Sequence, residues 1–432
     1  MNYYSTNNKE LRVSLKEAVI QGLAPDNGLF MPEVIPTLSG DFFKTLSSKS
    51  FEQIALEVAA NLIGNDLPKK ELEKIVDHTI QFDAPLIEIE KDIYSLELFH
   101  GPTLAFKDFG ARFLSGLLGY FASQQNKEVT ILVATSGDTG SAVANGFLNI
   151  PATNVVVLYP SGKVSLVQEK QFTTLGGNVR AIEVDGTFDD CQRIVKQCFL
   201  DKELNKKIAL TSANSINIAR LIPQSFYYFN AVAQLKDRQE IIFSVPSGNF
   251  GNLTAGLLAR RMGLPIKHFI AATNVNDVVP EYLKTKRFQP RPSVQTISNA
   301  MDVGNPSNFV RMLDLCGGDF NDIAQQVTGY SFTDDQTKDA MRVLYKKDKY
   351  VLDPHGAIGY LGLKEYEKGV KGTTGVFLET AHPAKFQEVV SSTLGEPIPL
   401  PPALEKFMLG EKSTILMSNQ FDEFKAYLLN SH

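Results

Sequence analysis

The stretch Glu240–Met262, EIIFSVPSGNFGNLTAGLLARRM, decides the fold class of this chain. Its start, Glu240–Val245, is an apolar run that predicts a buried strand, and the residues from Leu253 to Met262 carry helical spacing. Such strands are typical of parallel sheets covered by helices on both faces. Between strand and helix, Ser247-Gly248-Asn249-Phe250-Gly251 lets backbone N–H groups converge at a helix N-terminus, which favours phosphate binding. An ordinary strand–helix turn remains the alternative, because Gly and Asn are common there.

The same alternation of strand and helix extends along most of the chain. Strands are predicted at 129–134, 155–159, 179–184, 268–272 and 375–378, and helices at 141–148, 166–175 and 189–200. Residues 1–88 differ, because helical spacing at 52–63 and 71–80 is separated by loops. The sequence therefore predicts an α/β fold with two open, mainly parallel sheets and a helical N-terminal region.

Composition excludes several classes of function. The 43 basic and 48 acidic residues give a net charge of −5, and no basic run suggests nucleic-acid binding. Six His and three Cys, without a ligand motif, predict no metal site and no disulfide framework. The N-terminus has no export signal and no apolar stretch could span a membrane, so we expect a cytoplasmic protein.

Three motifs of common enzymes are absent. Ser161-Gly162-Lys163-Val164 lacks the hydroxyl residue and the first glycine of a phosphate-binding loop of the Walker type. No Gly-x-Gly-x-x-Gly or Gly-x-Ser-x-Gly motif follows a strand. These absences argue against a kinase, a nicotinamide-dependent enzyme and a hydrolase of that type. Because no metal site is predicted either, any demanding chemistry would use a borrowed cofactor.

Four further segments combine residues that suit a binding site, although each has a structural alternative. Lys107 lies between Phe106 and Phe109, where apolar surroundings would lower the pKa of its amine for Schiff-base chemistry, or where it would only extend to solvent. The other three are polar segments that favour anion binding but equally suit helix caps or turns: Thr135-Ser136-Gly137-Asp138-Thr139-Gly140, Ser212–Arg220 and Leu378–Phe386.

The combination and order of these segments resemble the bacterial type of the threonine synthase family. The resemblance spans nearly the whole chain, from Gly28-Leu29-Phe30-Met31-Pro32 to Thr380-Ala381-His382-Pro383-Ala384-Lys385-Phe386. It implies a fold-type-II enzyme that uses pyridoxal 5'-phosphate and converts O-phospho-L-homoserine and water into L-threonine and phosphate. On the same scaffold, a phospho-lyase releasing 2-oxobutyrate and a non-enzymatic sensor of small molecules are the alternatives.

The resemblance also implies residue roles. Lys107 would be the catalytic residue that binds the cofactor. The remaining cofactor-binding residues would be Ser247, Gly248, Asn249, Phe250, Gly251, Thr380 and Asp138. Asp138 stands where many fold relatives have Asn beside the phenolic oxygen, so its charge would need to turn away. The substrate-binding residues would be Thr135, Ser136, Gly137, Thr139, Asn214, Ser215, Arg220, Lys163 and Arg112, and Lys385 is a further cation for the substrate phosphate.

We expect an N-terminal helical region at 1–88 and a large cofactor-binding domain at 89–122 and 240–400. A small domain would occupy 123–239, and a C-terminal extension 401–432. We expect a monomer or a weak dimer that binds a small-molecule substrate and neither nucleic acid nor membrane.

Overall fold

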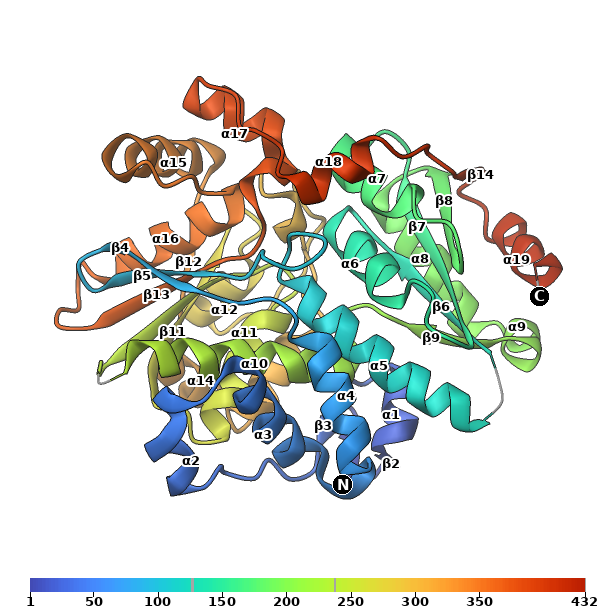
Figure 1. Cartoon of the computed structure of the whole chain (residues 1–432), viewed down its shortest axis with the longest axis horizontal. Helices are drawn as coiled ribbons and strands as arrows, with labels where there is room; N and C mark the ends of the chain where they lie inside the picture. The colour runs from blue at the N-terminus through green and yellow to red at the C-terminus, as the bar shows by residue number, and fades with distance from the viewer. Residues whose placement is uncertain (126–127, 237, 432) are drawn as a thin grey trace.

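The computed structural model describes residues 1–125, 128–236 and 238–431. Its larger sheet has the strand order β12-β11-β10-β13-β5-β4 (Figure 1). All neighbouring strands are parallel except the hairpin of β4 and β5 at one edge. The strands are β4 (Leu86–Glu90), β5 (Ile93–Glu97), β10 (Ile241–Pro246), β11 (Ile266–Thr273), β12 (Val327–Ser331) and β13 (Thr374–Glu379).

A second sheet, entirely parallel, has the order β14-β8-β7-β6-β9. Its strands are β6 (Val129–Ala134), β7 (Thr153–Pro160), β8 (Val179–Asp185), β9 (Ala209–Ser212) and β14 (Ile415–Ser418). The predicted α/β class with two parallel sheets is confirmed. The last strand, β14, pairs with β8, so the C-terminal segment completes this sheet.

Helices cover both faces of each sheet, as Figure 1 shows. They include α5 (Lys107–Gln125), α6 (Asp138–Phe147), α7 (Leu166–Thr173), α8 (Phe188–Leu200), α10 (Ile218–Leu235), α11 (Gly251–Arg261), α15 (Asp334–Asp348), α16 (Pro354–Tyr366), α17 (Gln387–Leu394), α18 (Pro402–Met408) and α19 (Phe421–Asn430). One hydrophobic cluster contains Val133 of the second sheet, Phe243 of the larger sheet and Phe113 of α5. A continuous core therefore holds the two sheets against each other.

The N-terminal region contains more than the predicted helices. Helices α1 (Leu15–Gln21), α2 (Gly40–Thr45), α3 (Phe51–Ile63) and α4 (Lys69–Thr79) accompany a small antiparallel sheet of order β2-β1-β3. Its strands, β1 (Asn2–Ser5), β2 (Arg12–Ser14) and β3 (Phe30–Pro32), are too short to give a period of alternation. Helix α3 begins with a capping box in which Ser50 and Gln53 bond each other's backbone N–H.

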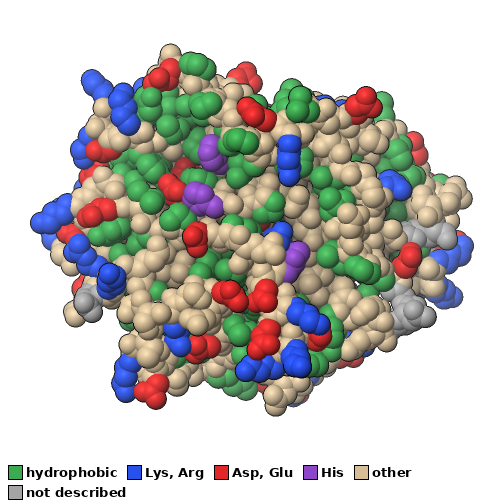
Figure 2. Space-filling model, viewed as in Figure 1, with side chains coloured by type: hydrophobic (Ala, Val, Ile, Leu, Met, Phe, Trp, Pro, Cys, Tyr) green, Lys and Arg blue, Asp and Glu red, His purple; other side chains and the backbone are tan. Residues whose placement is uncertain are grey.

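The face shown in Figure 2 has Lys and Arg side chains mixed with Asp and Glu rather than gathered into one basic surface. Within the described residues, no helix combines the length and apolar character needed to cross a membrane.

Candidate active site

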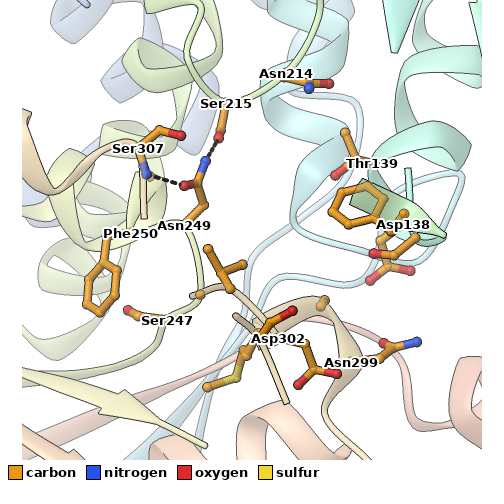
Figure 3. Close-up of a pocket in the computed structure, with 18 of the residues that line it drawn as sticks. Asp138, Thr139, Asn214, Ser215, Ser247, Asn249, Phe250, Asn299, Asp302 and Ser307 are labelled. Carbon is orange, nitrogen blue, oxygen red and sulfur yellow. Dashed lines mark hydrogen bonds between the residues drawn. The ribbon is translucent and has the colours of Figure 1, made fainter. Parts of the chain in front are cut away.

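A cavity of about 620 Å³ lies where the chain leaves the carboxyl ends of β6, β10 and β13. Open α/β sheets place ligands at this end of their strands. Figure 3 shows Ser247, Asn249 and Phe250 on one side of the space and Asp138 and Thr139 on the other. Fourteen predicted residues line it: Lys107, Ser136, Asp138, Thr139, Lys163, Asn214, Ser215, Arg220, Ser247, Gly248, Asn249, Phe250, Gly251 and Thr380.

The turn after β10 forms a cup of backbone N–H groups. Phe250 has a left-handed backbone (φ 59°), which turns the chain into α11 at Gly251. Among the described residues, the N–H groups of 249–252 have no acceptor in the protein. These free donors and the positive end of α11 suit a phosphate group without any basic side chain.

Gly248 is required by close packing at this cup. A Cβ atom there would lie 2.7 Å from the Cα of Met301 and 2.9 Å from the carbonyl oxygen of Ala300. The short helix η3 (Asn299–Met301) therefore rests directly on the cup. The Asn249 side chain does not face the phosphate position, because it donates to the Ser215 hydroxyl and accepts from the Ser307 N–H (2.6 Å).

Lys107 is the first residue of α5 and lines the cavity. The loop before it is fixed to the end of β13, because the Phe106 N–H donates to the Thr380 carbonyl (2.9 Å). Burial lowers the pKa of the Lys107 amine to about 8; Asp138 opposes this shift, whereas the charges of Lys385 and Arg220 add to it. Roughly a tenth to a quarter of the amine is thus neutral between pH 7 and 7.5, far more than for an ordinary lysine, which suits a nucleophile or proton carrier.

Asp138 begins α6 and forms an ion pair with Lys385, with 2.8 Å between Oδ1 and Nζ. The same Oδ1 accepts from the Gln168 side-chain amide (2.8 Å). Burial alone would raise the pKa of this carboxyl, but the charges of Lys385 and Lys107 hold it below its ordinary value. Lys385 also donates to the Thr103 carbonyl (2.7 Å) and is not among the cavity-lining residues, so its charge is not free for a substrate phosphate.

In the segment before α6, some residues shape the turn and others line the cavity. The Thr135 hydroxyl accepts from the N–H groups of Gly137 (2.9 Å) and Gly140 (2.8 Å), so Thr135 shapes the turn instead of lining the cavity. Gly137 (φ 141°) also lies behind the lining, packed against Gln168. Among the described residues, the N–H groups of Ser136, Asp138 and Thr139 have no acceptor, and these three residues line the cavity. They form a second cup, suited to a carboxylate.

Two of the predicted cations lie at the cavity at different depths. Arg220 in α10 is 3% exposed and donates to the Ala213 carbonyl, while its buried Nε has no partner among the described residues. Burial lowers the pKa of its guanidinium to about 10, so it stays charged. Lys163 is exposed and donates to the Gly186 carbonyl (3.1 Å), which places it at the cavity mouth.

The structure corrects the expectation for Arg112. Its side chain donates from Nε to the His78 carbonyl (2.7 Å) and from the guanidinium end to the Gln81 side chain. Arg112 is not among the cavity-lining residues. Its position within α5 directs the side chain away from the cavity, so that it joins α5 to the end of α4.

Sequence reasoning missed one wall of the cavity, formed by lining residues between 291 and 307 and by His355. His355 Nδ1 lies 2.5 Å from Asp353 Oδ1, and the Ala300 N–H donates to His355 Nε2 (3.3 Å). Asp302 accepts from the Thr296 hydroxyl (2.7 Å), and burial raises the pKa of its carboxyl to about 6. The sequence signal that could have indicated a loop at this wall is a run rich in turn residues and without periodicity, Met301-Asp302-Val303-Gly304-Asn305-Pro306.

Several buried polar atoms in the cavity wall have no protein partner within the described chain. They are Asn214 Oδ1, Arg220 Nε, Gln224 Oε1, Asn252 Nδ2 and Asn299 Oδ1. Native proteins rarely leave such atoms unsatisfied, so their concentration in one cavity points to a polar ligand. With the phosphate cup, Lys107 and Thr380 in the same cavity, the residues fit pyridoxal phosphate.

Comparisons with known proteins agree with this geometry. Family models match residues 2–80 (threonine synthase N terminus), 81–380 (pyridoxal-phosphate dependent enzyme) and 356–428 (threonine synthase, C-terminal). The chain is 48% identical to the threonine synthase of Haemophilus influenzae over 436 aligned residues, covering 100% of both chains. It is 47% identical to that of Escherichia coli, with 94% of each covered.

Solved structures give the same result. The crystal structure of threonine synthase from Escherichia coli superposes with a TM-score of 0.93 at 44% identity, covering 100% of both chains. The pyridoxal-phosphate-bound threonine synthase from Brucella melitensis gives a TM-score of 0.93 at 35% identity, covering 100% of this chain and 99% of that one. The family models and these relatives show that the chain belongs to the threonine synthase family of pyridoxal-phosphate-dependent enzymes.

Proposed function

We propose that this chain converts O-phospho-L-homoserine and water into L-threonine and phosphate. The observation that carries the proposal is the placement of Lys107 in one cavity with two separate cups of free N–H groups. One cup suits the phosphate of the cofactor and the other suits the carboxylate of an amino acid. The identity to threonine synthases over the full length of the chain supports this substrate.

The cofactor would be held by residues from three parts of the chain. Ser247–Gly251 would bind its phosphate, Thr380 would meet its ring nitrogen and Lys107 would bind its carbonyl carbon. A hydroxyl at the ring nitrogen, instead of a carboxylate, would leave the ring less fully protonated. When bound, pyridoxal phosphate supplies an electron sink for negative charge on the substrate carbons.

Lys107 would act as the proton carrier of the reaction. Its amine, with a pKa lowered to about 8 chiefly by burial, can accept a proton from the substrate α carbon and return it elsewhere on the substrate. The adjacent Phe106 and the buried loop around Asp108 fix the start of α5, so the amine operates from a rigid position. Asp108 accepts from the Thr103 hydroxyl (2.6 Å) and N–H (2.9 Å) within that loop.

Substrate binding would use the remaining lining residues. The N–H groups of Ser136, Asp138 and Thr139 would bind the substrate carboxylate. Arg220, with a buried Nε free of protein partners, would stabilise the substrate phosphate as it leaves, and Lys163 at the mouth would attract the dianion. We also propose a monomer or weak dimer.

Two alternatives share much of this geometry. A phospho-lyase would release phosphate without adding water at the β carbon and would give 2-oxobutyrate. A sensor would bind the ligand and catalyse nothing. The intact pair of Lys107 and phosphate cup argues against a sensor, because binding alone requires no reactive amine.

The experiment that tests the proposal is a product assay on the purified enzyme with O-phospho-L-homoserine. We expect L-threonine and phosphate in equal amounts. Release of 2-oxobutyrate would establish the phospho-lyase, and no turnover by a cofactor-loaded protein would favour the sensor. Lys107→Ala should lower turnover by several orders of magnitude, whereas Lys425→Ala, at a lysine outside the cavity lining, should retain most of it.

A further inference from the structure

A fully buried ion pair connects the loops at the ends of the two sheets. Asp138 begins α6, which follows β6, whereas Lys385 lies in the short helix η4 (Pro383–Phe386), which follows β13. The Asp138 side chain is 4% exposed and that of Lys385 is 0% exposed. A buried pair is costly to form, and removal of one partner leaves an uncompensated charge.

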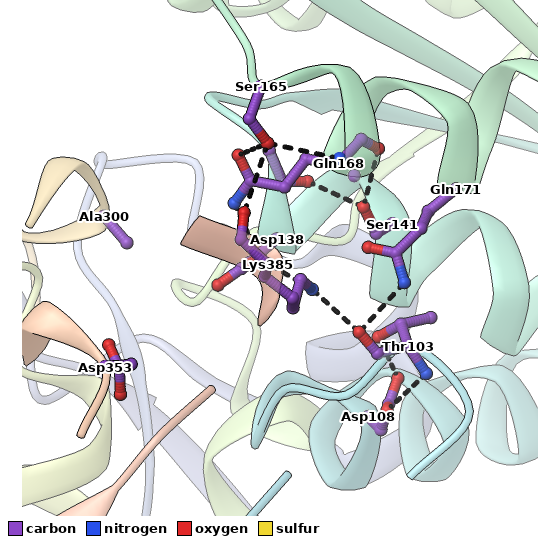
Figure 4. Close-up of polar contacts among 12 residues, drawn as sticks. Thr103, Asp108, Asp138, Ser141, Ser165, Gln168, Gln171, Ala300, Asp353 and Lys385 are labelled. Carbon is purple, nitrogen blue, oxygen red and sulfur yellow. Dashed lines mark hydrogen bonds and ion pairs between the residues drawn. The ribbon is translucent and has the colours of Figure 1, made fainter. Parts of the chain in front are cut away.

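Neighbouring groups hold both partners in place, as Figure 4 shows. Lys385 donates to the Thr103 carbonyl, which also accepts from the Gln171 side chain (3.0 Å). The Gln168 amide donates to the Asp138 carboxylate, and the Ser165 hydroxyl to the Gln168 side-chain oxygen (3.1 Å). The pair is therefore a fixed element of the cavity wall.

Asp138 of this pair lines the same cavity as Lys107. The charged groups that act on Lys107 come from three elements: Asp138 on α6, Lys385 on η4 and Arg220 on α10. Asp138 is the only carboxylate among them. Without Lys385, the Asp138 carboxylate would keep one side-chain donor, Gln168, and the remaining cation acting on it would be Lys107.

We propose that Lys385 is a positioning residue that neutralises Asp138, so that Asp138 does not capture Lys107 as a paired ammonium ion. The pair then presents nearly no net charge to the Lys107 amine, which stays available for the cofactor. This inference rests on the proposed role of Lys107, but its effect is on the protonation of that side chain and can be measured without turnover.

The two single replacements should have opposite effects. Lys385→Met leaves Asp138 free to pair with Lys107 and should raise the pKa of the Lys107 amine. Asp138→Asn leaves Lys385 as an unpaired cation nearby and should lower it. The double variant Asp138→Asn/Lys385→Met removes both charges and should return the Lys107 pKa to near its original value.

The measurement is competitive labelling of the full-length, cofactor-free chain with acetic anhydride over a range of pH, with the Lys107 peptide quantified by mass spectrometry. We expect Lys385→Met to raise the pKa by about one unit, which is about tenfold less labelling at neutral pH. Circular dichroism confirms that each variant is folded. The matched control is Lys425→Met, which breaks the partly buried pair with Asp201 (2.8 Å) far along the chain and should not change Lys107.

The inference is overturned if the two single variants shift the Lys107 pKa in the same direction, if Lys385→Met leaves it unchanged, or if the double variant fails to restore it. Should Lys385→Met not fold, Asp138→Asn and the double variant still carry the test, since the first must lower the pKa and the second restore it. A confirmed shift in an enzyme that makes no threonine would refute the proposed function and leave this inference standing.

Discussion

Replacement of Gly248 by alanine probes how closely the phosphate cup is packed. The new methyl group would lie 2.7 Å from Met301 Cα and 2.9 Å from the Ala300 carbonyl oxygen, which are both backbone atoms of η3. Neither can rotate away, so η3 or the cup must move. Overpacking of this kind costs about 1–3 kcal/mol in the free energy of unfolding. The shifted N–H groups should also weaken cofactor binding, by about tenfold or more if one hydrogen bond to phosphate is lost.

Gly251, in the same turn, provides the matched control. A methyl group there would have its nearest neighbour at 3.5 Å, the side-chain amide of Asn308, which is ordinary contact. Urea unfolding of the two cofactor-free variants should therefore show a loss of stability for Gly248→Ala and almost none for Gly251→Ala. Fluorescence titration with pyridoxal phosphate measures the affinity of each. Equal stability of Gly248→Ala and the unmodified chain would refute the argument from η3 packing.

Three further predictions concern two charged residues of the site, Lys107 and Arg220, and one outside it, Arg112. Pyridoxal phosphate should bind covalently to the cofactor-free chain at a rate that rises with pH and levels off above about pH 8, because only the neutral Lys107 amine reacts. A rate that does not change between pH 6 and 9 in stopped-flow measurements would contradict this. Arg220→Gln should lower kcat/KM at least about a hundredfold in steady-state assays. A change of less than threefold would refute a role for Arg220 in binding the substrate phosphate. Arg112→Gln should leave kcat/KM nearly unchanged. It should reduce the free energy of unfolding by about 1–3 kcal/mol in urea titrations, because the hydrogen bonds to the end of α4 are lost. A large rise in KM would show instead that Arg112 binds the substrate.

The main strands and the phosphate cup could be predicted because their signals are local. The apolar run of β10 and the two glycines after it stand together in the sequence, and the prediction for 129–134 matches β6 residue for residue. The strands β1, β2 and β3 could not be predicted in this way, since three or four residues carry no measurable period. The pairing of β14 with β8 depends on contacts between residues more than two hundred positions apart.

The contacts of charged residues near the site also could not be predicted from local sequence. Arg112 and Arg220 both stand in motif segments as candidate ligands of the substrate phosphate, but only the structure shows the direction in which each side chain leaves its helix. The partner of Asp138 could not be found from its own segment, because Lys385 follows it by 247 positions. The wall formed by Asn299–Met301 and His355 has no periodicity, so only the packing of η3 against Gly248 reveals it.

The most direct test of the central claim is turnover of O-phospho-L-homoserine in water enriched in oxygen-18. If phosphate leaves by elimination and water adds at the β carbon, L-threonine should carry one oxygen-18 atom in its hydroxyl group, and the released phosphate should carry none. Mass spectrometry of both products measures this in one reaction. Unlabelled threonine, labelled phosphate, or 2-oxobutyrate in place of threonine would contradict the proposed function.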